Sequence, residues 1–254
     1  MKSSAKAVVL RTAGTNCQYE TAHALSLSGF SVGVLHINEF VRGEKELEEF
    51  HLLVVPGGFA DGDYLGSAKV LANKLRFQMG TEIKRFIAEE KLVLGICNGF
   101  QALVKAGILP GFSGNYSEQV CTLTLNDSGH FQDQWVELES VAKNACIFTK
   151  GIRKLSCPIN HGEGKFIPGS KDVLKMLYKN RQVVLKYAEN PNGSTDSIAG
   201  ICDETGKVFG LMPHPEKNFT YWNDPRSLRG DLPEKGEGLL IFANAARYVK
   251  KKLL

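Results

Sequence analysis

The chain has 254 residues, of which 43% are hydrophobic and 23% are charged, and its formal net charge is +4 at pH 7. This length fits one large α/β domain or two small ones, and no shift in composition divides it, so we predict a single domain over residues 1–254. The mild charge and the scattered basic residues argue against a nucleic-acid partner; we interpret Lys250 to Lys252 as an exposed helix end. No apolar run reaches the roughly 18 residues of a membrane span, and the first residues lead into a strand rather than a signal peptide. We therefore expect a cytoplasmic protein without a membrane partner.

Six cysteines lie far apart and form no Cys-x-x-Cys pair. This spacing indicates neither a zinc ribbon nor a small disulfide framework, so no metal site is expected. We expect most of them to be buried and reduced, with Cys97 distinguished by its local sequence. The six are Cys17, Cys97, Cys121, Cys146, Cys157 and Cys202.

Strands and helices alternate along the first hundred residues. Apolar runs predict strands at residues 5–10, 31–37, 52–55 and 92–96, and helical periodicity predicts helices at residues 20–27, 44–50, 67–76 and 81–90. This alternation is typical of a mainly parallel sheet that is covered by helices on both faces.

The pattern changes after a helix predicted at residues 100–107. Shorter alternations at residues 120–125 and 135–138 indicate antiparallel strands, and further strands are predicted at residues 183–187, 197–202 and 208–212. Residues 203–206 form a predicted hairpin turn between the last two strands, and residues 238–251 form a closing amphipathic helix. The sequence thus predicts an α/β fold with a small antiparallel portion.

Cys97 stands in Gly95-Ile96-Cys97-Asn98-Gly99, between the predicted strand at residues 92–96 and the following helix. A nucleophile on such a strand-to-helix elbow is exposed above the sheet by a sharp turn. Unpaired N–H groups and the dipole at the helix N-terminus favour a thiolate there. We therefore predict that Cys97 is a catalytic nucleophile.

His214 is the best candidate for the base that such a thiol needs. It ends a predicted strand in Met212-Pro213-His214-Pro215-Glu216, where residues i and i+2 point to the same side. Glu216 can therefore orient the imidazole, and the flanking prolines restrict the backbone. His161, in the Gly-rich segment 160–164, competes for the role of base, whereas His23 and His36 look structural, and His51 and His130 have no acidic residue at a suggestive spacing.

Acyl chemistry also needs N–H donors for the developing oxyanion. The backbone N–H of Asn98, directly after the nucleophile, is one predicted donor. The second is predicted at Gly58 in Pro56-Gly57-Gly58-Phe59, which ends the strand at residues 52–55. Taken alone, Pro-Gly-Gly is only a turn.

Together these motifs resemble the class I (triad) glutamine amidotransferases. Further blocks extend the resemblance to the subfamily that supplies ammonia for purine biosynthesis: Gly14-Thr15-Asn16-Cys17, His161-Gly162-Glu163-Gly164 and Gly210-Leu211-Met212-Pro213-His214-Pro215-Glu216-Lys217. The resemblance implies a flavodoxin-like sheet and a glutaminase in which Cys97 forms a glutamyl thioester. It also implies that Gly57, Gln101, His161, Gly162 and Glu163 bind glutamine.

By the same resemblance, ammonia passes to a large synthetase subunit that uses ATP and magnesium to amidate formylglycinamide ribonucleotide, and a small subunit bridges the two. No cofactor is expected in this chain, which has no Gly-x-x-x-x-Gly-Lys-Ser/Thr loop. The chain departs from the pattern at Ala60-Asp61 and at Gly66-Ser67-Ala68-Lys69, and residues 220–235 look like an additional surface loop.

Other functions are compatible with parts of this pattern. One is a class I glutaminase that serves another synthetase, such as that for pyridoxal phosphate or carbamoyl phosphate. A cysteine peptidase or chaperone-like hydrolase can share the elbow, although such proteins usually lack the distal His-x-Glu. From a different class, a catalytically silent regulatory subunit can retain the fold.

Overall fold

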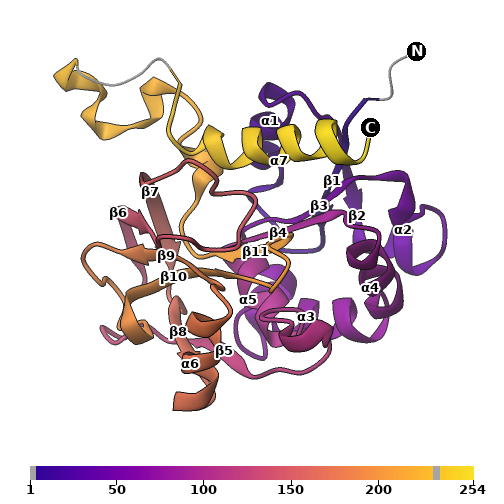
Figure 1. Ribbon diagram of the computed structural model, residues 1–254, viewed down its shortest axis with the longest axis horizontal. Helices are drawn as coiled ribbons and strands as arrows, with labels where there is room; N and C mark the ends of the chain where they lie inside the picture. The colour runs from indigo at the N-terminus through magenta and orange to yellow at the C-terminus, as the bar shows by residue number, and fades with distance from the viewer. Residues whose placement is uncertain (1–3, 231–234) are drawn as a thin grey trace.

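The computed structural model describes residues 4–230 and 235–254. Its main sheet has nine strands in the order β2-β1-β3-β4-β11-β10-β9-β6-β7 (Figure 1). The first five pair in parallel and the others antiparallel. The parallel strands are β1 (Lys6–Arg11), β2 (Ser31–His36), β3 (Leu52–Val55), β4 (Leu92–Ile96) and β11 (Val208–Leu211). The antiparallel strands are β6 (Gln132–Ser140), β7 (Lys154–His161), β9 (Val183–Tyr187) and β10 (Ile198–Cys202).

A two-stranded antiparallel sheet of β5 (Cys121–Thr124) and β8 (Lys165–Pro168) lies beside the main sheet. Helices cover the parallel half from both sides (Figure 1): α1 (Gln18–Leu27) and α7 (Leu239–Lys252) lie on one face, and α3 (Lys69–Phe77), α4 (Gly80–Ala88) and α5 (Asn98–Lys105) on the other. The predicted class, a mainly parallel sheet with helices on both faces and a small antiparallel portion, is confirmed.

The remaining helices are short or peripheral. They are α2 (Ile37–Val41), α6 (Lys171–Lys179) and the 3₁₀ turns η1 (Leu47–Glu49), η2 (Ala60–Asp63), η3 (Phe112–Gly114), η4 (Thr195–Ser197), η5 (Pro215–Lys217), η6 (Tyr221–Asn223) and η7 (Pro225–Arg229). The helix predicted at residues 44–50 is wrong, because only η1 forms there. None of the described helices has the length and apolar composition needed to cross a membrane.

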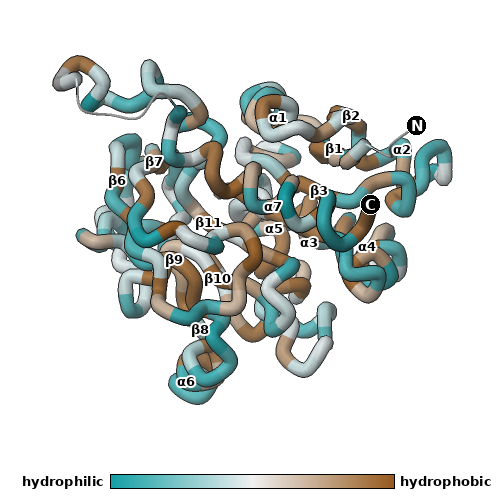
Figure 2. The backbone as a smooth tube through the Cα atoms, turned by 45° about the horizontal axis from the view of Figure 1, so that its top comes forward, coloured by the Kyte–Doolittle hydropathy of each residue, from teal (hydrophilic) through white to brown (hydrophobic). Residues whose placement is uncertain are grey.

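The core follows from burial of the inner parallel strands β1, β3, β4 and β11 on both faces. Every residue of β3 and β4 is buried, which explains why these strands read as continuous apolar runs rather than alternations. Figure 2 shows hydrophobic stretches at the centre of the molecule and hydrophilic ones at its periphery.

The motif-bearing loops gather at one edge of the sheet. The strand order reverses at β1, which lies between β2 and β3, and in open α/β sheets ligands bind beyond the carboxyl ends of the strands at such a reversal. Residues 14–17 follow β1, residues 56–59 follow β3, Cys97 follows β4 and His214 follows β11. Parallel pairing therefore brings these four distant segments together.

Residues 220–230 of the surface segment predicted at 220–235 project from the body of the molecule (Figure 1). A bridge between Thr220 and Lys235 closes its base, and η6 and η7 form part of it, with Trp222 and Leu228 exposed. Residues 231–234 of this prediction lie outside the described residues.

Candidate active site

Cys97 occupies the predicted elbow between β4 and α5. Its backbone has φ of 50° and ψ of −107°, a strained conformation for a residue with a side chain. The turn brings α5 so close to β3 that a Cβ on Gly99 would lie 1.8 Å from the Val55 carbonyl oxygen, so only glycine fits there. The Cys97 N–H donates to the Leu211 carbonyl at 2.8 Å, which ties the elbow to β11.

His214 and Glu216 form a buried pair beside this elbow. The distance from His214 Nδ1 to Glu216 Oε1 is 2.6 Å, and the two residues are 2% and 0% exposed. His214 Nε2 is buried without a hydrogen-bond partner among the described residues, and His214 and Cys97 line the same pocket of about 70 Å³. The imidazole is thus oriented through one nitrogen and has the other available for the thiol.

The surroundings of His214 favour its charged form. Burial by itself lowers the pKa of the imidazole, but the Glu216 carboxylate and the sulfurs of Cys97 and Cys17 outweigh it and raise the pKa well above 6.5. An imidazolium stabilised in this way can pair with a Cys97 thiolate.

The predicted oxyanion donors flank the same pocket. Gly58 lines it, and Asn98 is the first residue of α5, where a backbone N–H has no acceptor within the helix. In the described part of the chain, neither N–H donates to a protein acceptor. Both are therefore available to an oxygen that approaches the Cys97 sulfur.

Gln101 and Glu163 do not line this pocket. The Gln101 side chain is 2% exposed; its Nε2 donates to the Glu163 carbonyl at 2.6 Å, and its Oε1 accepts from Asn98 Nδ2 at 2.9 Å. Glu163 Oε1 accepts from the Ser67 N–H at 3.1 Å, and its Oε2 lies 3.3 Å from Lys105 Nζ. The two residues fasten the 161–164 loop to α5.

His161 is buried in a neutral setting. Its Nδ1 lies 3.1 Å from Asn126 Oδ1, and burial together with the neighbouring His214 lowers the pKa of His161 to about 4. Because it faces an amide and His214 faces a carboxylate, the geometry favours His214 as the base. The neighbouring Gly162 carbonyl accepts from the Asn126 N–H at 2.9 Å.

Gly57 makes room for the imidazole of His214. A Cβ at this position would lie 2.7 Å from His214 Cε1, so the imidazole packs on the bare glycine. Its carbonyl accepts the N–H groups of Asn16 and Cys17 at 3.4 and 3.2 Å, which binds the loop after β1 to the loop after β3.

Six further residues line the pocket, and none of them has a predicted role in catalysis: Asn16, Cys17, Phe59, Phe131, Asn160 and Lys217. The Asn160 carbonyl lies 3.6 Å from Cys97 Sγ, and Lys217 Nζ donates to Asn160 Oδ1 at 2.9 Å. Four of these residues follow from the motif blocks, since each block ends at the same sheet edge. Phe131 stands just before β6 and carries no sequence signal.

Cys17, His214 and Glu216 also bring three metal-ligating side chains within 4.8 Å of one another. However, His214 Nδ1 and Glu216 Oε1 are 2.6 Å apart. Two ligands at about 2.0–2.2 Å from one tetrahedral ion lie farther apart than this. The arrangement fits a shared proton rather than a metal ion.

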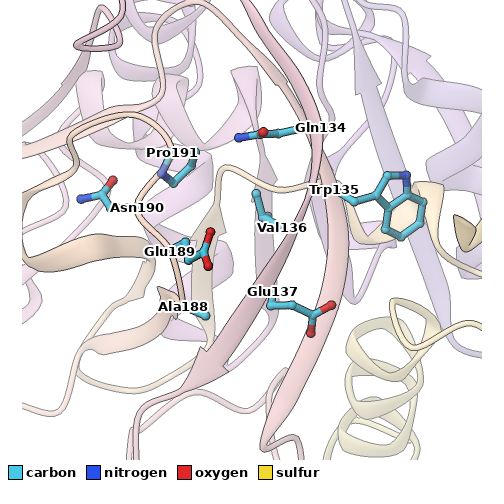
Figure 3. A pocket seen from close by; sticks show the side chains of 8 residues that line it. All are labelled: Gln134, Trp135, Val136, Glu137, Ala188, Glu189, Asn190 and Pro191. Carbon is cyan, nitrogen blue, oxygen red and sulfur yellow. The ribbon is translucent and has the colours of Figure 1, made fainter. Parts of the chain in front are cut away.

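A separate pocket of about 340 Å³ lies between residues 134–137 of β6 and residues 188–191 after β9. Figure 3 shows Gln134 extending toward Pro191 across it. Its lining contains none of the predicted catalytic residues, Cys97, His214 and Glu216, so the smaller pocket is the candidate site.

Comparison with known proteins agrees with this geometry. The model of the CobB/CobQ-like glutamine amidotransferase domain matches residues 4–249. The phosphoribosylformylglycinamidine synthase subunit PurQ of Dehalococcoides mccartyi is 43% identical over 256 residues, covering 98% of this chain and 99% of that protein. The PurQ protein of Methanococcus maripaludis is 37% identical over 268 residues, covering 97% and 98%.

A chain in the PurLQS structure from Thermotoga maritima is similar over 97% of this chain and 100% of that one, with 31% identity and a TM-score of 0.77. A putative GMP synthase protein from Thermoplasma acidophilum, 15% identical with a TM-score of 0.60, shares the fold over 99% of this chain and 100% of that one. The chain therefore belongs to the PurQ family of phosphoribosylformylglycinamidine synthase subunits, within the glutamine amidotransferases.

Proposed function

We propose that this chain is the glutaminase subunit of a phosphoribosylformylglycinamidine synthase and that Cys97, His214 and Glu216 are its catalytic triad. The observation that carries the proposal is the buried His214–Glu216 pair, whose imidazole lines the same pocket as a strained elbow cysteine and whose Nε2 has no partner among the described residues. Residues 1–254 act as one glutaminase domain. In its support, β1 from the beginning of the chain and β11 from near its end belong to the same sheet.

In the first half of the reaction, the Cys97 sulfur attacks the side-chain amide carbon of glutamine, and His214 Nε2 takes the thiol proton. The carbonyl oxygen becomes an oxyanion that the N–H groups of Gly58 and Asn98 stabilise. When the intermediate collapses, the bond from carbon to nitrogen breaks, and His214 gives its proton to the departing ammonia. A glutamyl thioester remains on Cys97.

In the second half, His214 removes a proton from a water molecule that attacks the thioester carbon. The same two N–H groups hold the second oxyanion, and the thiolate leaves and is reprotonated as glutamate departs. Glu216 keeps Nδ1 protonated and stabilises the imidazolium in both halves, without itself taking the proton.

The amino-acid end of glutamine is assigned to Gly57, Gln101, His161, Gly162 and Glu163. Support comes from the position of the loop: the Asn160 carbonyl, directly before it, contacts Cys97 Sγ. The side chains of Gln101 and Glu163 are occupied by contacts within the protein, so their part is to hold the loop, whose backbone meets the substrate.

Ammonia then passes to a separate synthetase subunit. The support for this step is that the related chain from Thermotoga maritima occurs in a PurLQS structure. We propose a PurL-like subunit, which binds ATP and magnesium and amidates formylglycinamide ribonucleotide, and a PurS-like bridging subunit. This chain needs no cofactor of its own for the reaction above. We place it in the cytoplasm; six free, buried cysteines fit a reducing compartment.

The test is glutamine hydrolysis by the chain alone and then with the large subunit, the small subunit, formylglycinamide ribonucleotide and ATP. We expect weak activity alone and strong stimulation in the complex, both lost in Cys97→Ala. Cys146→Ala, at a cysteine buried outside the pocket, is the matched control and should retain activity. If hydrolysis required Cys97 but was not stimulated by the synthetase subunits, the proposed pathway would be contradicted. If Cys97→Ala still hydrolysed glutamine, the proposed triad would be contradicted.

A further inference from the structure

Cys17 is a second thiol in the active-site pocket, and the mechanism above does not use it. The residue is 3% exposed, and its sulfur lies 4.0 Å from His214 Nδ1. Its thiol donates to Asn16 Oδ1 at 3.0 Å. Because the thiol proton is directed toward Asn16, the sulfur can present a lone pair to the imidazole N–H.

The position of this sulfur is fixed by the backbone around it. The Cys17 N–H donates to the Gly57 carbonyl at 3.2 Å, and the Cys17 carbonyl accepts from Thr21 Oγ1 at 2.7 Å. A Cβ on Gly57 would lie 3.3 Å from Cys17 Sγ and 2.7 Å from His214 Cε1. The sulfur and the imidazole therefore both pack against Gly57, where a side chain would occupy the same space.

We propose that Cys17 is a positioning residue for the base, an inference that rests on the proposed glutaminase function. Its sulfur is a second acceptor beside Glu216 for the His214 Nδ1–H, and it fixes the tilt of the ring so that Nε2 faces Cys97. Cys17 does not attack the substrate and forms no bond to it.

The charge on His214 should depend on this contact. Among the described residues, the titratable groups around the imidazole are Glu216, Cys17, Cys97 and His161, and Lys217 lines the same pocket. The first three favour the imidazolium, and His161 is neutral above pH about 4. Loss of the sulfur acceptor weakens the imidazolium, so the thiolate–imidazolium pair forms at higher pH.

The experiment compares Cys17→Val, which fills the space without an acceptor, with Cys17→Ser, which retains one. In Cys17→Val we expect kcat for glutamine hydrolysis to fall about tenfold with KM changed less than about twofold, because the base is misplaced but the substrate site is intact. The acid limb of the kcat/KM profile should move upward by about half a pH unit. Cys17→Ser should recover most of both effects.

A second measurement does not depend on turnover. The rate at which iodoacetamide alkylates Cys97, followed by peptide mass spectrometry against pH, reports the thiolate directly. In Cys17→Val this profile should shift upward like the acid limb, while thermal unfolding confirms that the variant is folded. If wild-type protein lacked Cys97-dependent hydrolysis, the proposed function would fail, and the alkylation profiles would still test Cys17.

Two outcomes would overturn the inference. One is a folded Cys17→Val variant with the kcat, pH profile and alkylation profile of the wild type. The other is equal impairment of Cys17→Val and Cys17→Ser, because a hydroxyl acceptor would then fail to replace the sulfur.

Discussion

The side chain of Asn98 accepts a hydrogen bond from the backbone N–H of Ala60 at 3.0 Å. Asn98 directly follows the nucleophile, and Ala60 lies two residues after Gly58, so one side chain connects the two segments that carry the proposed oxyanion donors. The same amide donates to Asp63 Oδ1 at 3.2 Å and to Gln101 Oε1 at 2.9 Å. The contact with Ala60 also explains how the departure at residues 60–61 is accommodated: the backbone makes the bond, and the Asp61 carboxylate pairs with Lys74 at 2.8 Å.

Asn98→Ala should therefore reduce catalysis more than substrate binding. Without the side chain, the 58–60 turn is free to move relative to α5, and we expect kcat to fall by about 10- to 100-fold with a smaller change in KM. The free energy of unfolding should fall by about 1–3 kcal/mol, because Ala60 and Gln101 each lose a buried partner. Steady-state kinetics and urea unfolding measure the two effects.

Asn115→Ala, at an exposed loop asparagine, is the matched control for Asn98→Ala. A folded Asn98→Ala variant with wild-type kcat would show that the oxyanion donors do not need this contact.

The parallel half of the fold could be predicted because its inner strands β1, β3, β4 and β11 are buried on both faces, and only the edge strand β2 is not. The predicted bounds at residues 52–55 and 92–96 agree with β3 and β4, and the hairpin turn at residues 203–206 joins β10 to β11. The failures lie where tertiary contacts decide the structure. β7 alternates apolar Leu155, Cys157 and Ile159 with other residues, but Pro158 within the run argues against a strand. It becomes a strand by pairing with β6 over eight residues.

Two helices were missed for different reasons. Ser170 accepts a hydrogen bond from the Val173 N–H and caps α6, a signal that the sequence does contain. α2 is only five residues long, and its cap is the ring of His36, which accepts from the Asn38 N–H at 3.1 Å. A helix this short has no periodicity to detect, so the sequence predicts residue 37 as the end of the preceding strand.

The site residues divide in a similar way. Cys97, His214 and Glu216 could be predicted as candidates because each stands in a local motif at the end of one strand, and the structure brings Cys97 and His214 to one pocket. Gln101 and Glu163 are 62 residues apart in the sequence, so no local sequence pattern predicts their contact. Phe131 reaches the pocket only through the assembled sheet edge. Cys17 belongs to the motif block at residues 14–17, but its contact with His214 spans 197 residues and has no local pattern.

His161 should make the protein less stable as the pH falls. In the folded chain its pKa is about 4, against 6.5 when it is exposed, so between these values the unfolded chain binds a proton that the native chain does not. Stability from this residue is fully present above pH 6.5 and is lost toward pH 4, by about 3 kcal/mol in all. Urea unfolding at pH 7.5 and 4.5 measures the loss.

His161→Gln should remove this part of the pH dependence, with His130→Gln, at an exposed histidine, as the matched control. Subtracting the variant from the wild type also cancels the opposite contribution of His214. Its raised pKa stabilises the fold below pH 6.5, and this contribution is lost as the pH rises through the folded value. An equal loss of stability in wild type and His161→Gln would contradict the assignment of a neutral, buried His161.

Glu216→Gln should nearly abolish turnover while leaving the fold in place. The amide keeps the shape but removes the charge that offsets burial of the imidazolium, so the pKa of His214 should fall and kcat should drop by about 10²- to 10⁴-fold. Alkylation of Cys97 near pH 7 should slow in parallel. Glu189→Gln, at an exposed carboxylate, serves as the control, and wild-type alkylation of Cys97 in Glu216→Gln would argue against the triad.

Gln101→Ala should raise KM for glutamine by about five- to twentyfold and lower kcat less. Its Nε2 holds the Glu163 carbonyl at 2.6 Å, so the truncated side chain frees the 161–164 loop that is proposed to meet the amino-acid end of glutamine. Lys105→Met weakens the same loop from a second point, through the ion pair with Glu163, and should change KM in the same direction.

The ratio of the two kinetic effects decides what Gln101 does, because its amide has a second partner in Asn98. Gln119→Ala, at an exposed glutamine, controls for the loss of an amide side chain. If kcat fell in Gln101→Ala while KM stayed at the wild-type value, the residue would act through Asn98 on the oxyanion donors and would leave the glutamine-binding set. A rise in KM in both Gln101→Ala and Lys105→Met would instead place the ordered 161–164 loop in direct contact with the substrate.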